Sequence, residues 1–85
     1  MYFIYYLQSK KDTSQHYTGY SEDLESRLHQ HNSGSVQSTK PYCPWELVFY
    51  EGYKSKKDAK RRELYLKTTK GRKALKIMLQ DSLPK

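Results

Sequence analysis

Apolar and aromatic side chains are concentrated in three short runs that are separated by polar segments. The first two runs cover residues 2–8 and Gln15–Tyr20, and both are rich in aromatic residues. Aromatic and β-branched residues favour β-strands, and the polar segment KKDTS between the two runs has the composition of a turn. The pattern therefore predicts a hairpin, with a third strand in the later run WELVFYEGY.

The segments between and after these runs predict three helices. Ser21 can cap the first one, because a serine hydroxyl accepts a hydrogen bond from an unpaired N–H of the first turn. Asn32 and Gly34 provide a stop, since these residues often end helices. The helices are expected over residues 22–32, over residues 56–68 after a Ser55 cap, and from Thr69 or Lys70 to about Gln80.

Strands followed by separate helices predict an α+β domain with a small, mainly antiparallel three-stranded sheet flanked by about three helices. With 85 residues, the chain has room for one domain over residues 1–85 with a small core. The single cysteine, Cys43, excludes a disulfide framework and a cysteine-rich zinc site. The apolar start is too short to span a membrane and has no basic region before it. We therefore expect a soluble cytoplasmic protein.

Positive charge is concentrated in one segment. Eleven lysines and arginines lie between Lys54 and Lys76 against two acids, which gives +9, while the rest of the chain sums to −2. A concentrated positive surface is typical of proteins that bind a phosphate backbone. A solvated lysine surface that maintains solubility is the alternative. The candidate nucleic-acid-binding residues are Lys54, Lys56, Lys57, Lys60, Arg61, Arg62, Lys67, Lys70, Arg72 and Lys73.

Two polar residues of the first helix are predicted to share a face. Leu24 and Leu28 are four residues apart and should face the sheet, and Arg27 and His31 have the same spacing on an adjacent stripe. The ordinary alternative is a surface arginine paired with Asp23 and a histidine in solvent near the helix end.

Glu63 is expected on the inner side of the second helix. At 100 degrees per residue it falls in one arc with Ala59 and Leu66. A buried carboxylate needs a partner, which would be either an arginine or a metal ion. A structural ion pair with Arg27 is one possibility. Magnesium is the other, because it prefers oxygen ligands and often needs one or two carboxylates beside a substrate phosphate.

Two tyrosines complete the set of candidate residues. Tyr5 lies on the first predicted strand and Tyr17 on the second, so a hairpin can place both hydroxyls on one face of the sheet. Most tyrosines in such a domain are core residues with a solvated hydroxyl. Together with an arginine, a histidine and an inward glutamate in a basic domain, however, they form a suitable set for phosphodiester hydrolysis.

With these residues in this order, the chain resembles the GIY-YIG nuclease superfamily, in particular its small stand-alone members and the N-terminal nuclease of UvrC-type repair proteins. The resemblance covers nearly the whole chain. It runs from Phe3-Ile4-Tyr5 and Tyr17-Thr18-Gly19 through DLESRLHQHNSG and PWELVFYEGY to the AKRRELYLK segment. Phe3 and Thr18 replace a glycine and an isoleucine of the two half-motifs. Many members add an asparagine after the glutamate, whereas the only asparagine here is Asn32.

The resemblance implies a role for each matching residue. Tyr5 and Tyr17 would orient or deprotonate the attacking water, and Gly19 would leave room in the site. Arg27 would contact the phosphate, and His31 matches a position that usually holds histidine or tyrosine. The resemblance also makes Glu63 the single metal ligand, for Mg²⁺ or Mn²⁺, and suggests a phosphate contact for Lys67.

The function implied by the resemblance is metal-dependent cleavage of DNA with low sequence specificity, in repair or on branched DNA. RNA is an alternative substrate, and a partner protein could supply targeting. The alternative from a different class is a nucleic-acid-binding domain on the same fold that cleaves weakly or not at all. A structural module that binds partners through its tyrosine-rich surface is a third possibility.

Overall fold

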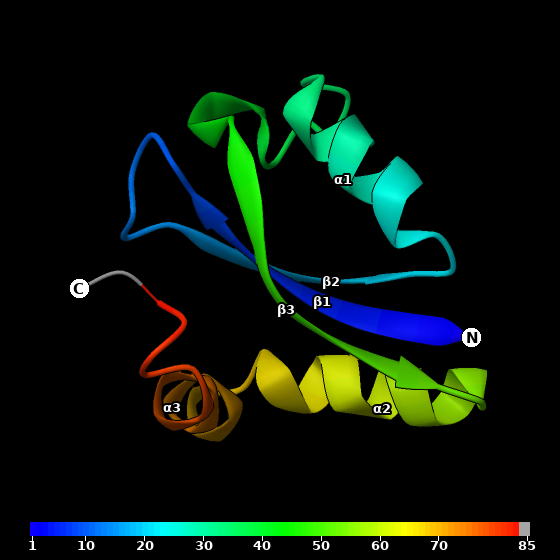
Figure 1. The fold of residues 1–85 in the computed structure, drawn as a ribbon. Helices are drawn as coiled ribbons and strands as arrows, with labels where there is room; N and C mark the ends of the chain where they lie inside the picture. Colours follow the sequence, from blue (N-terminus) through cyan, green and yellow to red (C-terminus); the bar gives the residue numbers. More distant parts are fainter. Residues whose placement is uncertain (84–85) are drawn as a thin grey trace.

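One antiparallel sheet runs through the middle of the molecule, in the computed structural model that describes residues 1–83 (Figure 1). Its strands are β1 (Tyr2–Ser9), β2 (His16–Ser21) and β3 (Trp45–Tyr53), in the order β2-β1-β3. In this register Tyr5 of β1 lies opposite Gly19 of β2. The predicted hairpin and third strand are confirmed.

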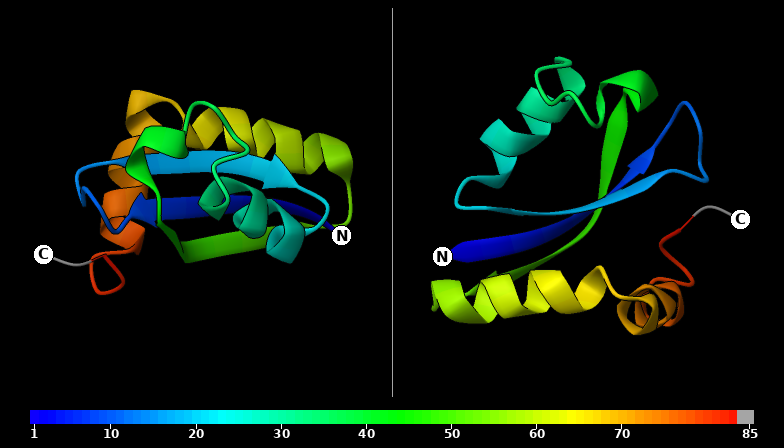
Figure 2. Two further views of the ribbon diagram at one scale, coloured as in Figure 1. Left: turned by 90° about the horizontal axis from the view of Figure 1, so that it is seen from above. Right: turned by 180° about the vertical axis from the view of Figure 1, so that it is seen from behind.

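Helices cover both faces of the sheet. Helix α1 (Leu24–Asn32) lies on one face and α2 (Lys56–Leu66) on the other, with α3 (Thr69–Met78) next to the end of α2 (Figures 1 and 2). A short 3₁₀ helix, η1 (Lys40–Tyr42), precedes β3. The predicted α+β class is therefore confirmed. In the described part of the chain, none of the helices has both the length and the apolar character needed to cross a membrane.

The central strand β1 divides the core into two parts because successive side chains of a strand point to opposite faces. Ile4 and Tyr6 pack with residues of α2 and α3, including Ala59, Leu66 and Leu75. On the opposite face, Tyr5 and Leu7 pack with Trp45, and the partly buried Leu24 and Leu28 of α1 join them. The predicted inward direction of the two α1 leucines is thus confirmed.

The start of α1 differs from the prediction. Asp23 is the N-cap, and its carboxylate accepts a hydrogen bond from the backbone N–H of Ser26 at 3.1 Å. Ser21 was the expected cap, but its hydroxyl is used in a local turn, where it accepts from Asp23 N and donates to Asp23 O. The helix therefore begins at Leu24, two residues later than predicted.

The other helix ends follow the predicted signals more closely. Ser55 caps α2 as predicted by accepting from the N–H of Asp58, although α2 ends at Leu66 and α3 at Met78, two residues before their expected ends. Gly34 follows α1 with a φ of 80°, a conformation that glycine adopts without strain. Asn32 has a structural role, because its side chain accepts from Trp45 N at 2.6 Å and donates to Trp45 O at 3.1 Å.

Gly71 in α3 permits the close approach of α2 and α3. A Cβ atom at this position would collide with the backbone carbonyl oxygen of Tyr65 and would lie 2.6 Å from Leu66 Cα. Alanine normally stabilises a helix relative to glycine by up to about 1 kcal/mol. Here we expect the opposite sign: Gly71→Ala should lower the free energy of unfolding by about 2 kcal/mol, because backbone atoms have to move.

Urea unfolding of Gly71→Ala and the wild type measures this difference. Lys73→Ala is the control, since it changes an exposed position of the same helix and should alter stability by less than about 0.5 kcal/mol. An increase in stability for Gly71→Ala would contradict the proposed helix contact.

Candidate active site

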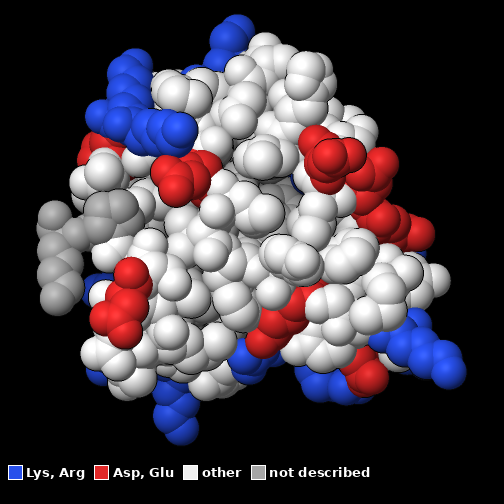
Figure 3. All heavy atoms as spheres, in the orientation of Figure 1, with Lys and Arg blue, Asp and Glu red and all other residues white. Residues whose placement is uncertain are grey.

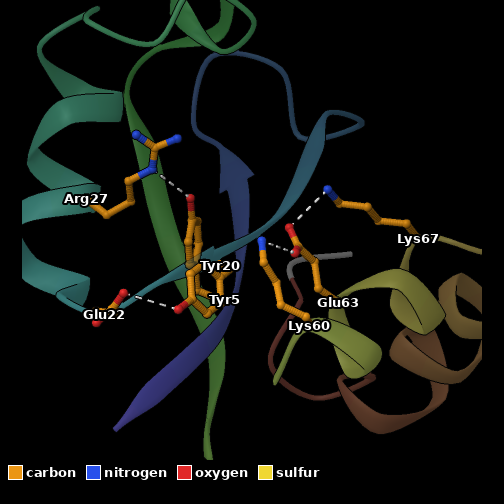
Figure 4. A network of polar contacts seen from close by, with 7 residues as sticks. All are labelled: Tyr5, Tyr20, Glu22, Arg27, Lys60, Glu63 and Lys67. Carbon is orange, nitrogen blue, oxygen red and sulfur yellow. Dashed lines mark hydrogen bonds and ion pairs between the residues drawn. The ribbon is translucent and has the colours of Figure 1, made fainter. Parts of the chain in front are cut away.

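The position of Tyr5 depends on the missing side chain of Gly19. Tyr5 is 2% exposed and lies on the central strand, directly opposite Gly19 on the edge strand β2. A Cβ atom on Gly19 would collide with the hydroxyl end of the Tyr5 ring. The tyrosine therefore passes over the backbone of β2, and its hydroxyl reaches a region between α1 and the edge of the sheet (Figure 4).

Two residues of α1 bind this hydroxyl. His31 Nε2 lies 2.8 Å from Tyr5 Oη, and Arg27 Nε donates to the same oxygen at 3.2 Å. The predicted shared stripe of Arg27 and His31 is thus confirmed, because both side chains converge on one atom. Arg27 also donates from Nη1 to Gln30 Oε1 at 2.9 Å, so the alternative of an Arg27 pair with Asp23 is wrong.

His31 is fully buried, and the alternative of a histidine in solvent is therefore wrong. Burial, and to a smaller extent the nearby positive charge of Arg27, lower the pKa of His31 to about 4. The imidazole is consequently neutral at neutral pH. Burial also raises the pKa of the Tyr5 hydroxyl, so that this group keeps its proton in the free protein.

Thr39 is a site residue that the sequence reasoning missed. It is 1% exposed, and its Oγ1 lies 2.7 Å from His31 Nδ1. The same hydroxyl donates to the carbonyl oxygen of Val36 at 3.3 Å, so its oxygen accepts the Nδ1–H of His31. We assign the Nδ1–H tautomer on this basis, with Nε2 free to accept the Tyr5 proton. Thr39 lies in the loop before β3, where no periodic pattern indicates burial.

The second tyrosine lies beside the same histidine. The ring centroids of Tyr17 and His31 are 4.9 Å apart, and those of Tyr5 and Tyr17 are 6.2 Å apart. The expectation that both tyrosines share one face of the sheet is confirmed, since both pack in the core cluster of the α1 side. Tyr5, Tyr17, Arg27 and His31 thus form a continuous group, which we call the tyrosine–histidine cluster.

Glu63 approaches from the other side of the sheet. Its side chain is 14% exposed, and it pairs with Lys60 Nζ at 3.4 Å and Lys67 Nζ at 3.2 Å. An ion pair with Arg27 was one of the expected solutions and is wrong, because Arg27 binds Tyr5. Both lysines extend flexible stems along α2 so that their ammonium groups reach the carboxylate (Figure 4). The negative charge of Glu63 nevertheless contributes to the raised pKa of Tyr5.

Few side chains near Glu63 could serve as metal ligands. Within residues 1–83, no cluster of three or more histidine, cysteine, aspartate or glutamate side chains could hold a metal ion. Magnesium tolerates such a site, because it keeps several waters and needs one or two carboxylates beside substrate phosphates. The chemistry of Glu63 therefore fits a hard divalent cation bound mainly through water and phosphate, and does not fit zinc.

The basic residues of the Lys54–Lys76 segment occupy different surroundings. Lys60, Arg61, Arg62 and Lys67 are paired with carboxylates of Glu63, Asp58 and Glu51. On the face shown in Figure 3, lysine and arginine atoms lie toward the rim and the centre is largely uncharged. The remaining predicted nucleic-acid-binding residues, which are exposed, are Lys54, Lys56, Lys57, Lys70, Arg72 and Lys73.

Comparison with known proteins gives a family match over most of the chain. Residues 1–76 match the sequence profile described as the GIY-YIG catalytic domain. The UPF0213 protein of Staphylococcus saprophyticus is 36% identical over 78 residues, which cover 91% of this chain and 93% of that protein. The UPF0213 protein of Clostridium perfringens is 31% identical over 84 residues, or 98% of this chain and 88% of the relative.

The burial of neutral His31 predicts a pH-dependent stability. Its pKa is about 4 in the folded protein and near 6.5 in the unfolded chain, so the unfolded chain binds an additional proton between these values. The free energy of unfolding should therefore be highest above about pH 6.5 and fall by up to about 3 kcal/mol as the pH decreases to about 4. Urea unfolding at several pH values measures this dependence.

Two histidine variants identify the responsible group. His31→Gln should reduce the pH dependence, whereas His29→Gln, at an exposed position on the same helix, should leave it unchanged. A part should persist in both variants, because burial and then the charge of Lys76 lower the pKa of His16. If His31→Gln kept the full dependence, the buried neutral histidine would not be its source.

Proposed function

The chain belongs to the GIY-YIG catalytic domain family, and we propose that it is a divalent-metal-dependent DNA endonuclease of low sequence specificity. The observation that carries the proposal is the convergence of Arg27 and His31 on the Tyr5 hydroxyl, with Glu63 close enough to affect its pKa. We further propose that residues 1–85 act as one nuclease domain, in repair or on branched DNA.

In this proposal, Arg27 binds the scissile phosphate. Its Nε is used by Tyr5 and its Nη1 by Gln30, and the guanidinium still has further N–H donors. Its positive charge is held next to a neutral histidine, so that the region between α1 and the sheet edge attracts anions. Stabilisation of the charge that develops on phosphate oxygens is the expected contribution of such a group.

The tyrosine–histidine cluster supplies a path for the proton of the attacking water. As the water oxygen bonds to phosphorus, its proton passes to Tyr5 Oη and the proton of Tyr5 passes to His31 Nε2. In the same step the bond from phosphorus to the leaving sugar oxygen breaks, and that oxygen takes a proton from solvent water. His31 is a weak base in the free protein, partly because of the charge of Arg27. A phosphate bound to Arg27 offsets that charge and therefore raises the pKa of His31 when substrate is present. Tyr17 then packs against both rings and limits access of bulk water.

Glu63 is the residue that would hold Mg²⁺ or Mn²⁺. When bound, such an ion supplies a positive charge at the phosphate and lowers the pKa of a coordinated water. The ammonium groups of Lys60 and Lys67 neutralise Glu63 in the free protein. On substrate binding, Lys67 can turn from the carboxylate toward a phosphate, because its side chain is long and half exposed. The role of Gly19 is to leave space for Tyr5.

A nicking assay tests the role of Glu63. Supercoiled and branched DNA are incubated with the wild type or Glu63→Gln in the presence of Mg²⁺, Mn²⁺ or EDTA. The variant keeps the side-chain shape and loses the charge, so metal-dependent nicking should fall at least about 100-fold while DNA affinity is retained. Glu46→Gln, at an exposed position of β3, is the matched control.

The outcomes separate the candidate functions. Unchanged nicking by Glu63→Gln would remove this residue from the mechanism. If the wild type binds DNA but does not nick it under any condition, the non-cleaving nucleic-acid-binding domain becomes the better description. Such a domain would show salt-sensitive binding without a metal-dependent product.

Thr39 is proposed as a positioning residue that acts through His31. Thr39→Val removes the hydroxyl that accepts from Nδ1, and we expect a loss of nicking activity on the order of 100-fold, comparable to the loss of a general base. Thr39→Ser keeps a hydroxyl and should restore most of the activity. Nitrogen NMR of His31 provides a second readout, because the Nδ1–H tautomer should dominate in the wild type and be depleted in Thr39→Val.

The spectrum distinguishes this role from a purely structural one. A folded Thr39→Val protein with reduced activity and an unchanged tautomer would rule out the proposed action of Thr39 through the imidazole.

A further inference from the structure

A groove of about 470 Å³ lies beside the edge strand β2, on the face of the sheet that α2 and α3 cover. Its volume is in the range of sites that bind small molecules or parts of larger ones. Aromatic rings and cations line it together: Tyr6, His16 and Tyr17 from the sheet, Lys67 after α2, and Arg72 and Lys76 from α3. Among the described residues that line the groove, none is an aspartate or a glutamate.

Arg72 and Lys76 differ from the cations of α2. They are four residues apart on α3 and therefore lie on the same side of that helix. Within residues 1–83, neither has a carboxylate oxygen within 4.0 Å, whereas Lys60, Arg61, Arg62 and Lys67 are all paired. The positive charge of Arg72 and Lys76 is consequently not neutralised locally, and it is directed at a concave surface.

The charges of these two residues are felt inside the groove. Lys76 lowers the pKa of His16, in addition to the larger effect of burial. Arg72 acts on Tyr6, where its charge partly offsets the increase in pKa caused by burial. The Tyr6 and His16 rings stack with their centroids 5.3 Å apart and their planes within 7°, so an aromatic pair forms part of this wall of the groove.

The groove and the tyrosine–histidine cluster lie on opposite faces of the sheet, and two residues connect the groove to the candidate active site around the edge strand β2. Tyr17 lines the groove, and its ring is also 4.9 Å from the ring of His31. Lys67 lines the groove as well, and its Nζ is 3.2 Å from Glu63 (Figure 4). A polymer with a phosphodiester at Arg27 has to continue beyond it, and this groove offers a cationic path along the edge of β2.

We propose that the groove binds the sugar–phosphate backbone of the substrate strand next to the bond held at the tyrosine–histidine cluster. This inference rests on the proposed function in that it takes a nucleic acid as the substrate. Arg72 and Lys76 bind successive phosphates of this strand. Lys67 binds a phosphate that lies between these two and Glu63. The stacked pair of Tyr6 and His16 contacts the sugar and base side of the same strand.

Binding measured without catalysis tests the groove. A fluorescein-labelled DNA flap, which contains duplex and single-stranded segments, is titrated with protein in EDTA at several salt concentrations. Arg72→Gln/Lys76→Gln should weaken binding and reduce the slope of log K against log salt by roughly 1.4 to 1.8, because two phosphate contacts are lost. The wild type measured under the same conditions gives the reference slope.

The matched control removes the same charge from the same helix. Lys70→Gln/Lys73→Gln changes two exposed cations that do not line the groove, and its slope should fall by less than half as much. Both double variants change exposed residues, and far-UV circular dichroism confirms that they remain folded. If binding and its salt slope fell equally in the two double variants, the proposed groove site would be wrong and diffuse electrostatic attraction would explain the binding. The proposal would also be wrong if the wild type did not bind the flap.

The result is independent of cleavage. If the wild type does not nick DNA but the Arg72/Lys76 variant selectively loses binding, the nuclease proposal fails and the groove stands. If the wild type nicks DNA and both double variants lose binding equally, the nuclease proposal is supported and the proposal that the groove binds the strand is wrong.

Discussion

The contact between the Tyr5 ring and the bare backbone of Gly19 determines where polar chemistry can occur in this molecule. β1 is the central strand, so a tyrosine on it would normally end within the core. Because Gly19 has no side chain, the ring crosses the edge strand and presents its oxygen to α1. The arginine and the histidine are then positioned relative to that oxygen, and the loop before β3 is positioned relative to the histidine. The Tyr5 hydroxyl and the His31 ring together connect the sheet, α1 and the loop before β3.

The electrostatics of the site depend on how differently its charged groups are solvated. His31 is fully buried and neutral, while Arg27 is partly exposed and keeps its charge. Glu63 lies on the opposite side of the sheet and is compensated by two lysines. Positive potential therefore remains at Arg27 on the α1 side, whereas the carboxylate on the α2 side is neutralised by its lysines in the free protein. A bound phosphate could compete with Glu63 for these lysines and so free the carboxylate for a cation.

Much of the fold could be predicted from the sequence, because strand alternation and helix periodicity reflect burial directly. WELVFYEGY coincides with β3, and Ala59 and Leu66 occupy the buried side of α2. The common direction of Arg27 and His31 followed from their spacing in the same way. The start of α1 did not follow, because Ser21 and Asp23 are both good caps and only the local turn decides between them.

The parts of the site that could not be predicted depend on tertiary contacts. Lys60 and Lys67 are three and four residues from Glu63, a spacing typical of ion pairs on a helix. The spacing alone could not decide between these lysines, Arg27 and a metal ion as the partner of the carboxylate. Thr39 does not lie in a helix or strand, so no periodic pattern of apolar residues indicates that it is buried. It is covered by the Trp45 indole, which donates to its carbonyl oxygen at 2.9 Å, and by the His31 ring, which contacts its hydroxyl. In small domains, polar residues of irregular loops are therefore identified only when the three-dimensional arrangement is known.

The double hydrogen bond between the Asn32 side chain and the Trp45 backbone has a consequence for how the family can diversify. It fastens the end of α1 to the start of β3, so the intervening loop has fixed ends. The cost of lengthening a loop with fixed ends grows only slowly with length. Insertions in the exposed part of this loop would consequently change the outer surface at a small cost in free energy. New surface contacts could arise in this loop while the end of α1 stays fastened to the start of β3.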